Sequence, residues 1–245
     1  MRIPILTVGD PKLFVARTAT LKKKVKILEL DSLDQVKKNI KGHLQIIKTS
    51  KCSNTKPGKL YKSNAQYVLD NLNYSIKQTM LNERTALVTG PLSKENIISI
   101  DKSFTGHTEF IKKVTKSKDV LMMLASDQLR VALSTTHIPL KNVSKKITKE
   151  LIINKVKILN EDLQSKFNIH KPSIKVLGLN PHAGENGKIG REEQDHIKPA
   201  IRELRKKKIN VSMPVSADTA FSNKSLKETD AFLGMYHDQV LPVLK

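Results

Sequence analysis

The stretch Ala231-Phe232-Leu233-Gly234-Met235-Tyr236-His237-Asp238-Gln239 joins an apolar run to a cluster of polar side chains. Residues 231–235 predict a short buried strand, because a strand covered on both faces is apolar without alternation. The same order occurs twice more: residues 176–179 precede His182, and residues 131–133 precede His137. Repeated buried strands that each lead into a histidine motif indicate the parallel sheet of an α/β protein.

Helix patterns fill the intervals between these strands. Apolar side chains recur at the three- and four-residue spacing of an amphipathic helix in residues 63–78, 148–167 and 192–208. Further extended segments are predicted at residues 3–8, 25–30, 85–89, 119–124, 129–135, 173–179 and 211–215. The 85–89 run is predicted to be a buried strand that Gly90-Pro91 ends. Residues 31–60 are polar and give no clear prediction. The alternation predicts parallel crossovers, and no Gly-x-Gly-x-x-Gly motif indicates a Rossmann domain.

The three histidines are candidates for a metal site. Neutral imidazole is the most common protein ligand of zinc and similar ions. Residues that follow the carboxyl ends of parallel strands share one edge of a sheet. Three imidazoles at such an edge, from His137, His182 and His237, would leave one position open for substrate, as catalytic zinc sites do. For each histidine alone, the alternative is an ordinary structural role.

The charge of the chain comes mainly from lysine. Lysine and arginine number 44 against 23 acidic residues, for a formal net charge of +21, and 37 of the 44 are lysine. Specific recognition of phosphates and bases favours the planar arginine fork, and single strands stack on aromatic side chains, which make up only 4% of this chain. The composition therefore predicts a solvated lysine-rich surface and no specific nucleic-acid partner.

Composition also bounds the cellular setting. The single cysteine, Cys52, excludes an internal disulfide and a cysteine-based metal site. No apolar run is long enough for a transmembrane helix, and the apolar part of the N-terminus is too short for a signal peptide. These features predict a cytoplasmic protein without a membrane partner.

Short motifs follow one another between Pro57 and Lys245. They are PGKL (57–60), NAQYVL (64–69), LVTGPLSK (87–94), GHTEF (106–110), MML (122–124), the stretch 129–140, NPHAGE (180–185), ADTAF (217–221) and MYHDQ (235–239). In this order they resemble the 4-hydroxythreonine-4-phosphate dehydrogenase family, which serves pyridoxal phosphate (vitamin B6) biosynthesis.

The resemblance implies a fold and an activity. The fold is α/β, with a two-domain α/β/α architecture similar to isocitrate and isopropylmalate dehydrogenases, and the sequence does not locate the domain boundary within residues 1–245. The activity is NAD-dependent oxidation of 4-phosphooxy-L-threonine, followed by decarboxylation to 3-amino-2-oxopropyl phosphate. The alternative is a related dehydrogenase of threonate or erythronate phosphate, because the motifs serve metal and phosphate and do not choose between these substrates.

The resemblance also implies how the metal is bound. His137, His182 and His237 would hold a divalent ion (zinc, magnesium or cobalt) in a site shared between the subunits of a homodimer. Asp218 and Asp238 are candidates for orienting these histidines, since carboxylates often accept the second ring N–H of a metal-binding histidine. For Asp218, capping of a turn is the alternative.

The substrate contacts implied by the resemblance are His107, Thr108 and Lys245, which would bind a small phosphorylated amino acid. Hydroxyl, imidazole and backbone N–H groups are suitable donors to phosphate and carboxylate. An alternative for Thr108 is the N-cap of a helix. Lys94 is either a phosphate contact or, as favoured here, a surface lysine at a helix start.

Three departures from the family pattern carry expectations of their own. Residues 12–17, which are bulky and charged, replace a loop of small residues. Val240 and Met213 stand where the family has glycine, and a positive φ there would cost about 1 to 3 kcal/mol. The family continues beyond Lys245 with a segment that contributes to the NAD site. The resemblance therefore predicts that a C-terminal part is missing, and that the 245-residue chain alone is a poor oxidant or an inactive remnant.

Overall fold

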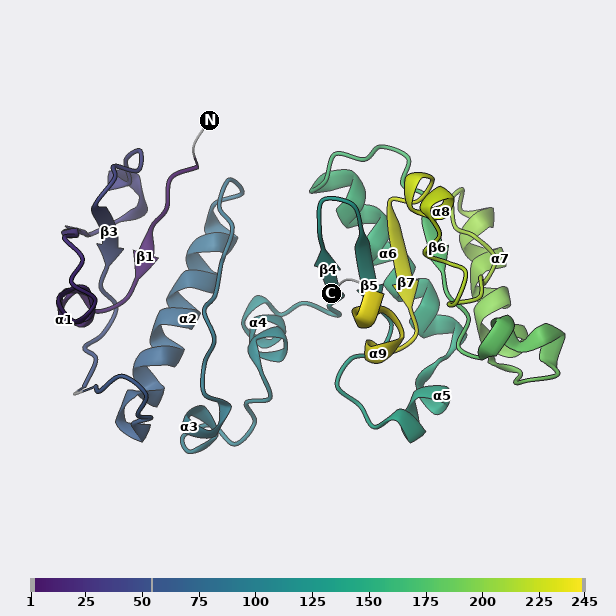
Figure 1. Cartoon of the computed structure of the whole chain (residues 1–245), viewed down its shortest axis with the longest axis horizontal. Helices are drawn as coiled ribbons and strands as arrows, with labels where there is room; N and C mark the ends of the chain where they lie inside the picture. Colours follow the sequence, from purple (N-terminus) through teal and green to yellow (C-terminus); the bar gives the residue numbers. More distant parts are fainter. Residues whose placement is uncertain (1–2, 54, 244–245) are drawn as a thin grey trace. The chain divides into compact units, whose positions relative to one another are not determined.

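The computed structural model describes residues 3–53 and 55–243. The chain divides into two compact units, Met1–Asp119 and Val120–Lys245. The first runs from purple to teal in Figure 1, and the second continues through green to yellow. Each unit combines helices with parallel strands, which confirms the α/β class.

The first unit contains a three-stranded parallel sheet of order β1-β3-β2. Its strands are β1 (Thr7–Val8), β2 (Lys26–Leu30) and β3 (His43–Ile47). The central strand β3 lies within residues 31–60, where no element was predicted. Its short run of Leu44, Ile46 and Ile47 is interrupted by Gln45, whose side chain donates to the Lys37 carbonyl at 2.9 Å and accepts from the Lys37 N–H at 2.7 Å. Because Gln45 is buried and hydrogen-bonded, a polar residue interrupts the apolar run, and the sequence pattern does not indicate this strand.

The helices of the first unit are α1 (Pro11–Thr20), α2 (Ala65–Leu81), α3 (Lys94–Ile98) and α4 (His107–Thr115), with short 3-10 turns η1 (Leu33–Gln35) and η2 (Lys62–Asn64). The last three helices contribute to a small apolar cluster. Leu69 of α2, Ile97 of α3 and Phe104 form the buried cluster. The prediction of a helix at residues 63–78 is confirmed by α2.

Residues 12–17, which stand where the family has a loop of small residues, belong to helix α1. Asp10 caps this helix through a 3.1 Å bond from the Lys12 N–H to its Oδ1, and Pro11 opens it.

One expectation for the first unit is wrong. Residues 85–89 do not form a buried strand: Val88 is 91% exposed and the segment has no regular structure. An apolar run becomes a strand only when a neighbouring strand pairs with its backbone, and the described β1-β3-β2 sheet does not pair with it.

The second unit is built on a four-stranded sheet of order β4-β5-β7-β6. Its strands are β4 (Met122–Ala125), β5 (Arg130–Leu133), β6 (Ile174–Val176) and β7 (Ala231–Gly234). β7 runs parallel to both β5 and β6, while β4 is an antiparallel edge strand. Val211 and Val215 form isolated bridges to the other side of the β6 segment, so residues 211–215 are extended, as predicted.

Helices and short turns connect these strands. They are η3 (Leu140–Asn142), α5 (Val143–Lys146), α6 (Lys149–Ser165), η4 (Pro181–Gly187), the π-helix η5 (Glu193–Ile197), α7 (Lys198–Lys206), α8 (Asn223–Lys227), α9 (His237–Val240) and η6 (Leu241–Val243). The helix predicted at residues 192–208 is thus a π-helical turn that continues into α7. Thr148 caps α6 by accepting a 3.1 Å bond from the Leu151 N–H.

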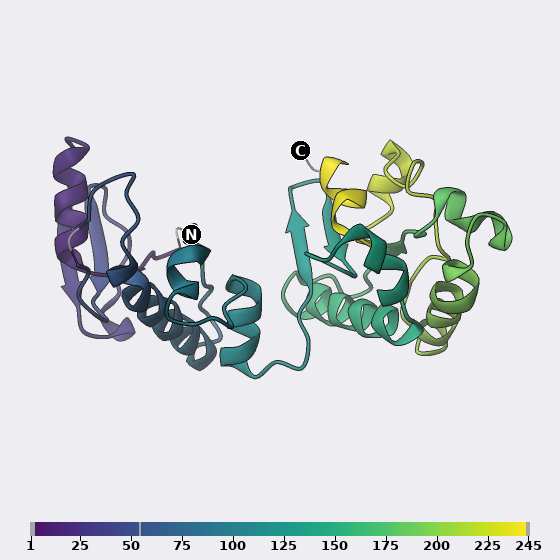
Figure 2. The ribbon, with the colours of Figure 1, turned by 90° about the horizontal axis from the view of Figure 1, so that it is seen from below.

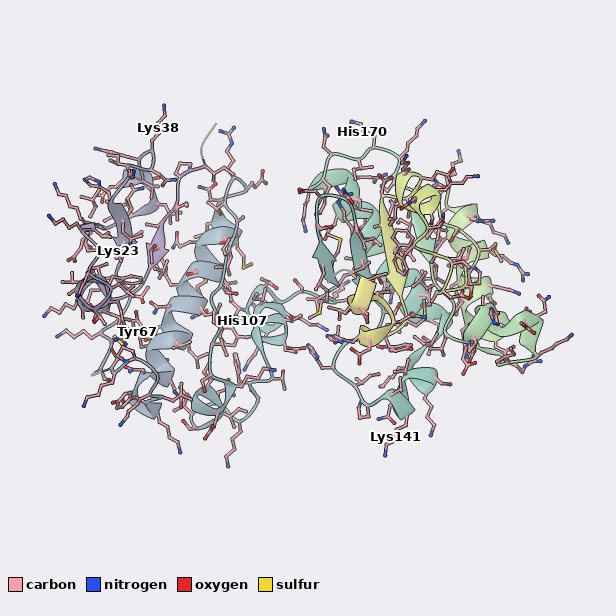
Figure 3. The ribbon with its side chains drawn as sticks, in the orientation of Figure 1. Lys23, Lys38, Tyr67, His107, Lys141 and His170 are labelled. Atoms are coloured by element: carbon pink, nitrogen blue, oxygen red, sulfur yellow. The ribbon has the colours of Figure 1, made fainter. Side chains whose placement is uncertain are left out.

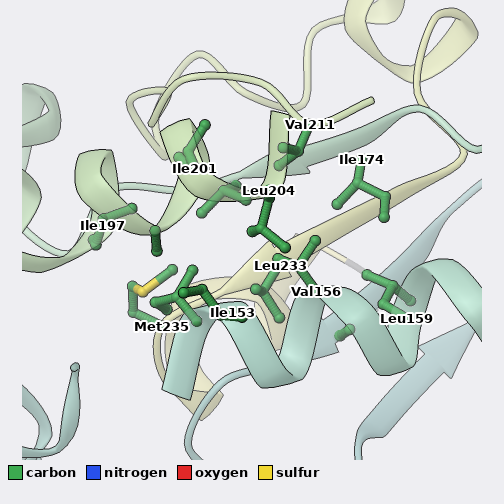
Figure 4. Close-up of a cluster of buried hydrophobic side chains, with 14 of the residues drawn as sticks. Ile153, Val156, Leu159, Ile174, Ile197, Ile201, Leu204, Val211, Leu233 and Met235 are labelled. Carbon is green, nitrogen blue, oxygen red and sulfur yellow. The ribbon is translucent and has the colours of Figure 1, made fainter. Parts of the chain in front are cut away.

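The larger apolar core lies between this sheet and the pair α6 and α7. Figure 4 shows Val156 and Leu159 of α6 facing Ile201 and Leu204 of α7, with Leu233 of β7 beside them. All five side chains are fully or almost fully buried. Because apolar residues at helical spacing need such a surface to cover them, this core explains why α6 and α7 follow the sequence pattern.

A second core covers the other face of the sheet. Phe232 of β7 points into it together with Val131 and Leu133 of β5, while Ala231 and Leu233 point into the larger core. Figure 2 shows α6 and α7, in teal to green, along one side of the sheet and the yellow C-terminal segment on the other. Burial on both faces is why the strand at residues 231–234 reads as an uninterrupted apolar run.

The surface carries the lysine excess. Lys23, Lys38 and Lys141 extend away from the ribbon in Figure 3. Within the described residues, none of the helices combines the length and apolar character needed to cross a membrane.

Candidate functional site

The three predicted histidines follow the carboxyl ends of three neighbouring parallel strands of the second unit. His137 follows β5, His237 follows the central strand β7, and His182 follows β6. Since parallel strands end at the same edge, this edge of the sheet collects all three segments.

His137 and His237 lie side by side. Their ring centroids are 5.6 Å apart, with an angle of 46° between the ring planes. The two strand ends are tied together by Thr135, whose hydroxyl and backbone N–H both donate to the Met235 carbonyl, at 2.7 and 3.2 Å. The structure therefore brings together within one chain two of the three predicted ligands.

Asp238 orients the ring of His237. Its Oδ1 lies 2.8 Å from Nδ1 of His237, and His237 is the first residue of α9. A carboxylate accepts a hydrogen bond from a protonated Nδ1, which leaves Nε2 as the nitrogen with a free lone pair. In this tautomer the lone pair of Nε2 is free to bind a metal ion or a proton.

His182 lies on an unusual turn. Residues 182–186 have successive φ values of 51°, 52°, 78°, 41° and 57°, so the chain makes a left-handed turn inside η4. Each non-glycine residue in this conformation costs about 1 to 2 kcal/mol. A turn that contains four such residues requires strong bonds from its surroundings.

Asp218 lies beside His182 without a close hydrogen bond. Its Oδ2 is 3.8 Å from Nδ1 of His182, and both side chains are more than half exposed. A hydrogen bond from Ser216 lowers the pKa of Asp218, and the nearby His182 lowers it further. Asp218 therefore stays charged next to His182, and it also lines a cavity of about 760 Å³ together with Ala217, Thr219, Phe221, Ser222, Gln239, Pro242 and Val243.

Gln239, which was predicted only as part of the motif MYHDQ (235–239), connects two segments of the site. Its Oε1 accepts a 2.7 Å bond from the Met235 N–H, and its Nε2 donates a 2.6 Å bond to the Gly178 carbonyl. One side chain thus joins the segment that leads to His237 with the segment that leads to His182.

The donor set of a single chain is incomplete for a metal ion. In the part of the chain that the structure describes, no group of three or more histidine, cysteine, aspartate or glutamate side chains is placed to hold one. The resemblance implied a site shared between two subunits, and within one chain the structure places His137 and His237 side by side. The neutral imidazoles of His137 and His237 suit a borderline divalent ion, and such an ion would need further ligands from elsewhere.

The predicted substrate contacts His107 and Thr108 belong to the first unit, where they open α4 (Figure 3). Gly106 occupies the N-cap position, so the alternative that Thr108 caps the helix is wrong. Lys94, the first residue of α3, brings its Nζ close to Gly106: a Cβ on that glycine would lie 3.7 Å from it. Lys245 lies outside the described residues.

The expected strain at Val240 is absent. Neither Val240 nor Met213 has a positive φ. Val240 ends α9 and is fully buried, and a Cβ on Gly234 would lie only 2.5 Å from its Cγ1. The bulk of Val240 therefore fills space that Gly234 leaves open, and the prediction of a conformational penalty is wrong.

We expect the substitution Val240→Gly to destabilise the second unit by about 2 to 4 kcal/mol, because it removes a buried side chain and places glycine in a helix. Urea unfolding followed by hydrogen exchange of peptides from residues 120–243 measures this change. The exposed Val243, replaced by glycine, is the matched control and should change stability far less. A stabilised Val240→Gly variant would show that valine is strained after all.

Comparisons with known proteins bear on the whole chain. The family model described as pyridoxal phosphate biosynthetic protein PdxA matches residues 2–245. The chain is 44% identical over 241 residues to the 4-hydroxythreonine-4-phosphate dehydrogenase of Pseudoalteromonas translucida (strain TAC 125), covering 98% of this chain and 73% of the relative. It is 42% identical to the enzyme of that name from Citrobacter koseri, covering 99% of this chain and 74% of the relative.

Solved structures agree with this similarity. The crystal structure of a 4-hydroxythreonine-4-phosphate dehydrogenase from Burkholderia phymatum matches with a TM-score of 0.87 and 30% identity, over 98% of this chain and 72% of that chain. A terephthalate 1,2-cis-dihydrodioldehydrogenase from Burkholderia xenovorans matches with a TM-score of 0.67 at 23% identity, over 98% of this chain and 73% of that chain, which shows likeness of fold alone.

Proposed function

Because the chain belongs to the family of the pyridoxal phosphate biosynthetic protein PdxA, a family of dehydrogenases, we propose that it oxidises 4-phosphooxy-L-threonine with NAD. Oxidation of the secondary alcohol gives a β-keto acid, which loses carbon dioxide and takes up a proton to give 3-amino-2-oxopropyl phosphate. The observation that supports this most directly is the pair His137 and His237 at the carboxyl edge of a parallel sheet.

We propose that the pair binds one divalent ion, with zinc, magnesium and cobalt as candidates. When bound, the ion would act as a Lewis acid on the substrate hydroxyl, and NAD would accept the hydride. Imidazole donors suit zinc and cobalt better than magnesium, which prefers oxygen ligands, and Asp238 holds the ring of His237 with its Nε2 free. Since one chain supplies two clustered imidazoles, we propose that the third, His182, comes from the second subunit of a homodimer.

The substrate's phosphate would be bound by the first unit. His107 and Thr108 open α4, whose first backbone N–H groups lack partners within the helix and carry partial positive charge. Lys94 adds a cation near Gly106. These groups are suitable donors for a phosphate, and the role of Lys94 is thus proposed as a phosphate contact in preference to the surface role favoured from the sequence.

The test is a coupled measurement of NADH formation and product. The chain is freed of metal with EDTA and assayed with NAD and 4-phosphooxy-L-threonine, with and without added Zn²⁺, Mg²⁺ or Co²⁺. We expect metal-dependent NADH absorbance and one 3-amino-2-oxopropyl phosphate per NADH. Parallel assays use threonate 4-phosphate and erythronate 4-phosphate. Turnover confined to either of these, or the same rate with and without metal, would contradict the proposal. No turnover with any of the three substrates would instead support the alternative of an inactive remnant.

A further inference from the structure

The left-handed turn that carries His182 is held by a buried carboxylate. Glu193 is 1% exposed, and its Oε1 accepts hydrogen bonds from the backbone N–H groups of Leu179 and Asn180, at 2.7 and 2.8 Å. Its Oε2 accepts a third bond, at 2.9 Å, from Nδ2 of Asn180. The three bonds fix the two residues that immediately precede Pro181 and His182.

The backbone of the turn packs closely against this carboxylate. A Cβ on Gly184 would lie only 2.6 Å from Oε2 of Glu193, so the backbone of the turn passes directly over the carboxylate. Gly178 also approaches the turn closely, because a Cβ there would lie 2.8 Å from Cα of Ala183. Glu193 therefore hydrogen-bonds to the chain before His182 and lies against the backbone of the turn at Gly184 after it.

A second carboxylate, that of Glu192, also binds the side chain of Asn180. Nδ2 of Asn180 donates to Oε2 of Glu192 at 2.7 Å as well as to Glu193, so both of its hydrogens are used. Glu192 in turn accepts from the Ser144 hydroxyl near the start of α5. Hydrogen bonds from Ser144 and Asn180 lower the pKa of Glu192, which keeps this carboxylate charged and accepting.

Burying a carboxylate at position 193 costs folding free energy that a residue with only a packing role would not require. Among the described residues no lysine or arginine forms an ion pair with Glu193, whose carboxylate accepts hydrogen bonds from two backbone N–H groups and from the Asn180 side-chain amide. Burial of a carboxylate without a cation is unfavourable, and a neutral side chain would fill the same volume at lower cost. Glu193 also opens a π-helical turn, a feature that is common at functional sites.

We propose that Glu193 is a positioning residue that holds the left-handed turn so that the His182 imidazole is presented to the metal ion. The inference rests on the proposed role of His182 as a metal ligand. Glu193 acts through backbone and Asn180 contacts and does not itself touch metal or substrate.

The test is a Co²⁺ titration of the full chain, read from the visible absorption of the bound ion. The variant Glu193→Gln keeps the size and one acceptor, but it turns an N–H group toward Nδ2 of Asn180. We expect its dissociation constant for Co²⁺ to rise about 10- to 100-fold, as for other residues that orient metal ligands, with a changed Co²⁺ spectrum. The control Asp195→Asn removes an equal charge two residues away, where the exposed carboxylate pairs with Arg191, and it should leave the titration unchanged.

A double-mutant cycle separates positioning from stability. In a His182→Ala background, Glu193→Gln should still lower the unfolding temperature but should no longer weaken Co²⁺ binding, because the ligand it positions is gone. Far-UV circular dichroism checks the fold of each variant, and Glu193→Asp, which keeps the charge on a shorter side chain, serves if Glu193→Gln does not fold.

The outcomes are distinguishable. If His182→Ala weakens Co²⁺ binding but no Glu193 variant does, the positioning role is overturned and the proposed metal site stands. If Glu193→Gln weakens binding equally with and without His182, Glu193 does not act through that histidine and the inference falls. If His182→Ala itself has no effect on Co²⁺ binding, the proposed ligand role and this inference fall together.

Discussion

The substitution His237→Ala is expected to lower metal-dependent NADH formation about 1,000-fold. The reason is that it removes one of the two clustered imidazoles, and a Lewis acid contributes several kcal/mol of stabilisation, where each 1.4 kcal/mol is about tenfold in rate. Initial rates with 4-phosphooxy-L-threonine at saturating NAD and metal measure the effect, with a Co²⁺ titration alongside. We expect the loss of rate to accompany loss of tight Co²⁺ binding.

The matched control is His170→Ala. His170 is an exposed histidine on the connection between α6 and β6, away from the carboxyl edge of the sheet (Figure 3). Its removal should leave both rate and Co²⁺ affinity unchanged. Full activity of the His237→Ala variant would remove the observation on which the proposed function depends.

Mixing experiments extend this prediction to the dimer. If His137 and His237 of one chain meet His182 of the partner subunit, neither His182→Ala nor His137→Ala should be active alone. An equal mixture that exchanges subunits should recover about a quarter of the wild-type rate, because half the dimers are mixed and each has one intact site. A mixture of His137→Ala with His237→Ala should stay inactive, since both lesions fall in the clustered pair. Recovery in neither mixture would contradict a shared site.

The substitution Phe232→Ala is expected to destabilise the second unit by about 3 to 5 kcal/mol, the usual cost of deleting a buried phenylalanine. Phe232 is 1% exposed in the central strand β7, and its ring centroid lies 4.8 Å from that of Phe221. The cavity would open in the core formed by β5, β7 and the C-terminal segment, directly beneath the strand end that leads to His237.

Hydrogen exchange of peptides from β5, β7 and α6 as a function of urea measures this loss. Phe167→Ala is the control: Phe167 is 40% exposed and contacts the Arg130 guanidinium 5.4 Å from its ring centroid. That variant should lose about 0.5 to 1 kcal/mol, the value of an exposed cation–π contact. An equal effect of the two substitutions would show that the second core contributes little to stability.

Much of the second unit was predictable from sequence because its pattern is local. The run at residues 231–235 is apolar on both faces and became β7, and the helical spacing of residues 148–167 became α6. By contrast, the run at residues 85–89 also has an apolar centre, but it has no described strand beside it and stays irregular. These two runs differ in whether a neighbouring strand pairs with them. A strand forms only with such a neighbour, and the residues of the run itself do not indicate whether one is present.

The sequence by itself determined the α/β class, the family, and the three histidine motifs that follow strands, since these depend on residue type and order. The tertiary structure alone decided that His137 lies against His237, that His182 sits on a left-handed turn, and that Glu193 is buried beneath that turn. It also decided that Val240 packs against Gly234 without backbone strain. Such outcomes depend on hydrogen bonds and packing between segments far apart in the chain, which compete with local propensity and override it.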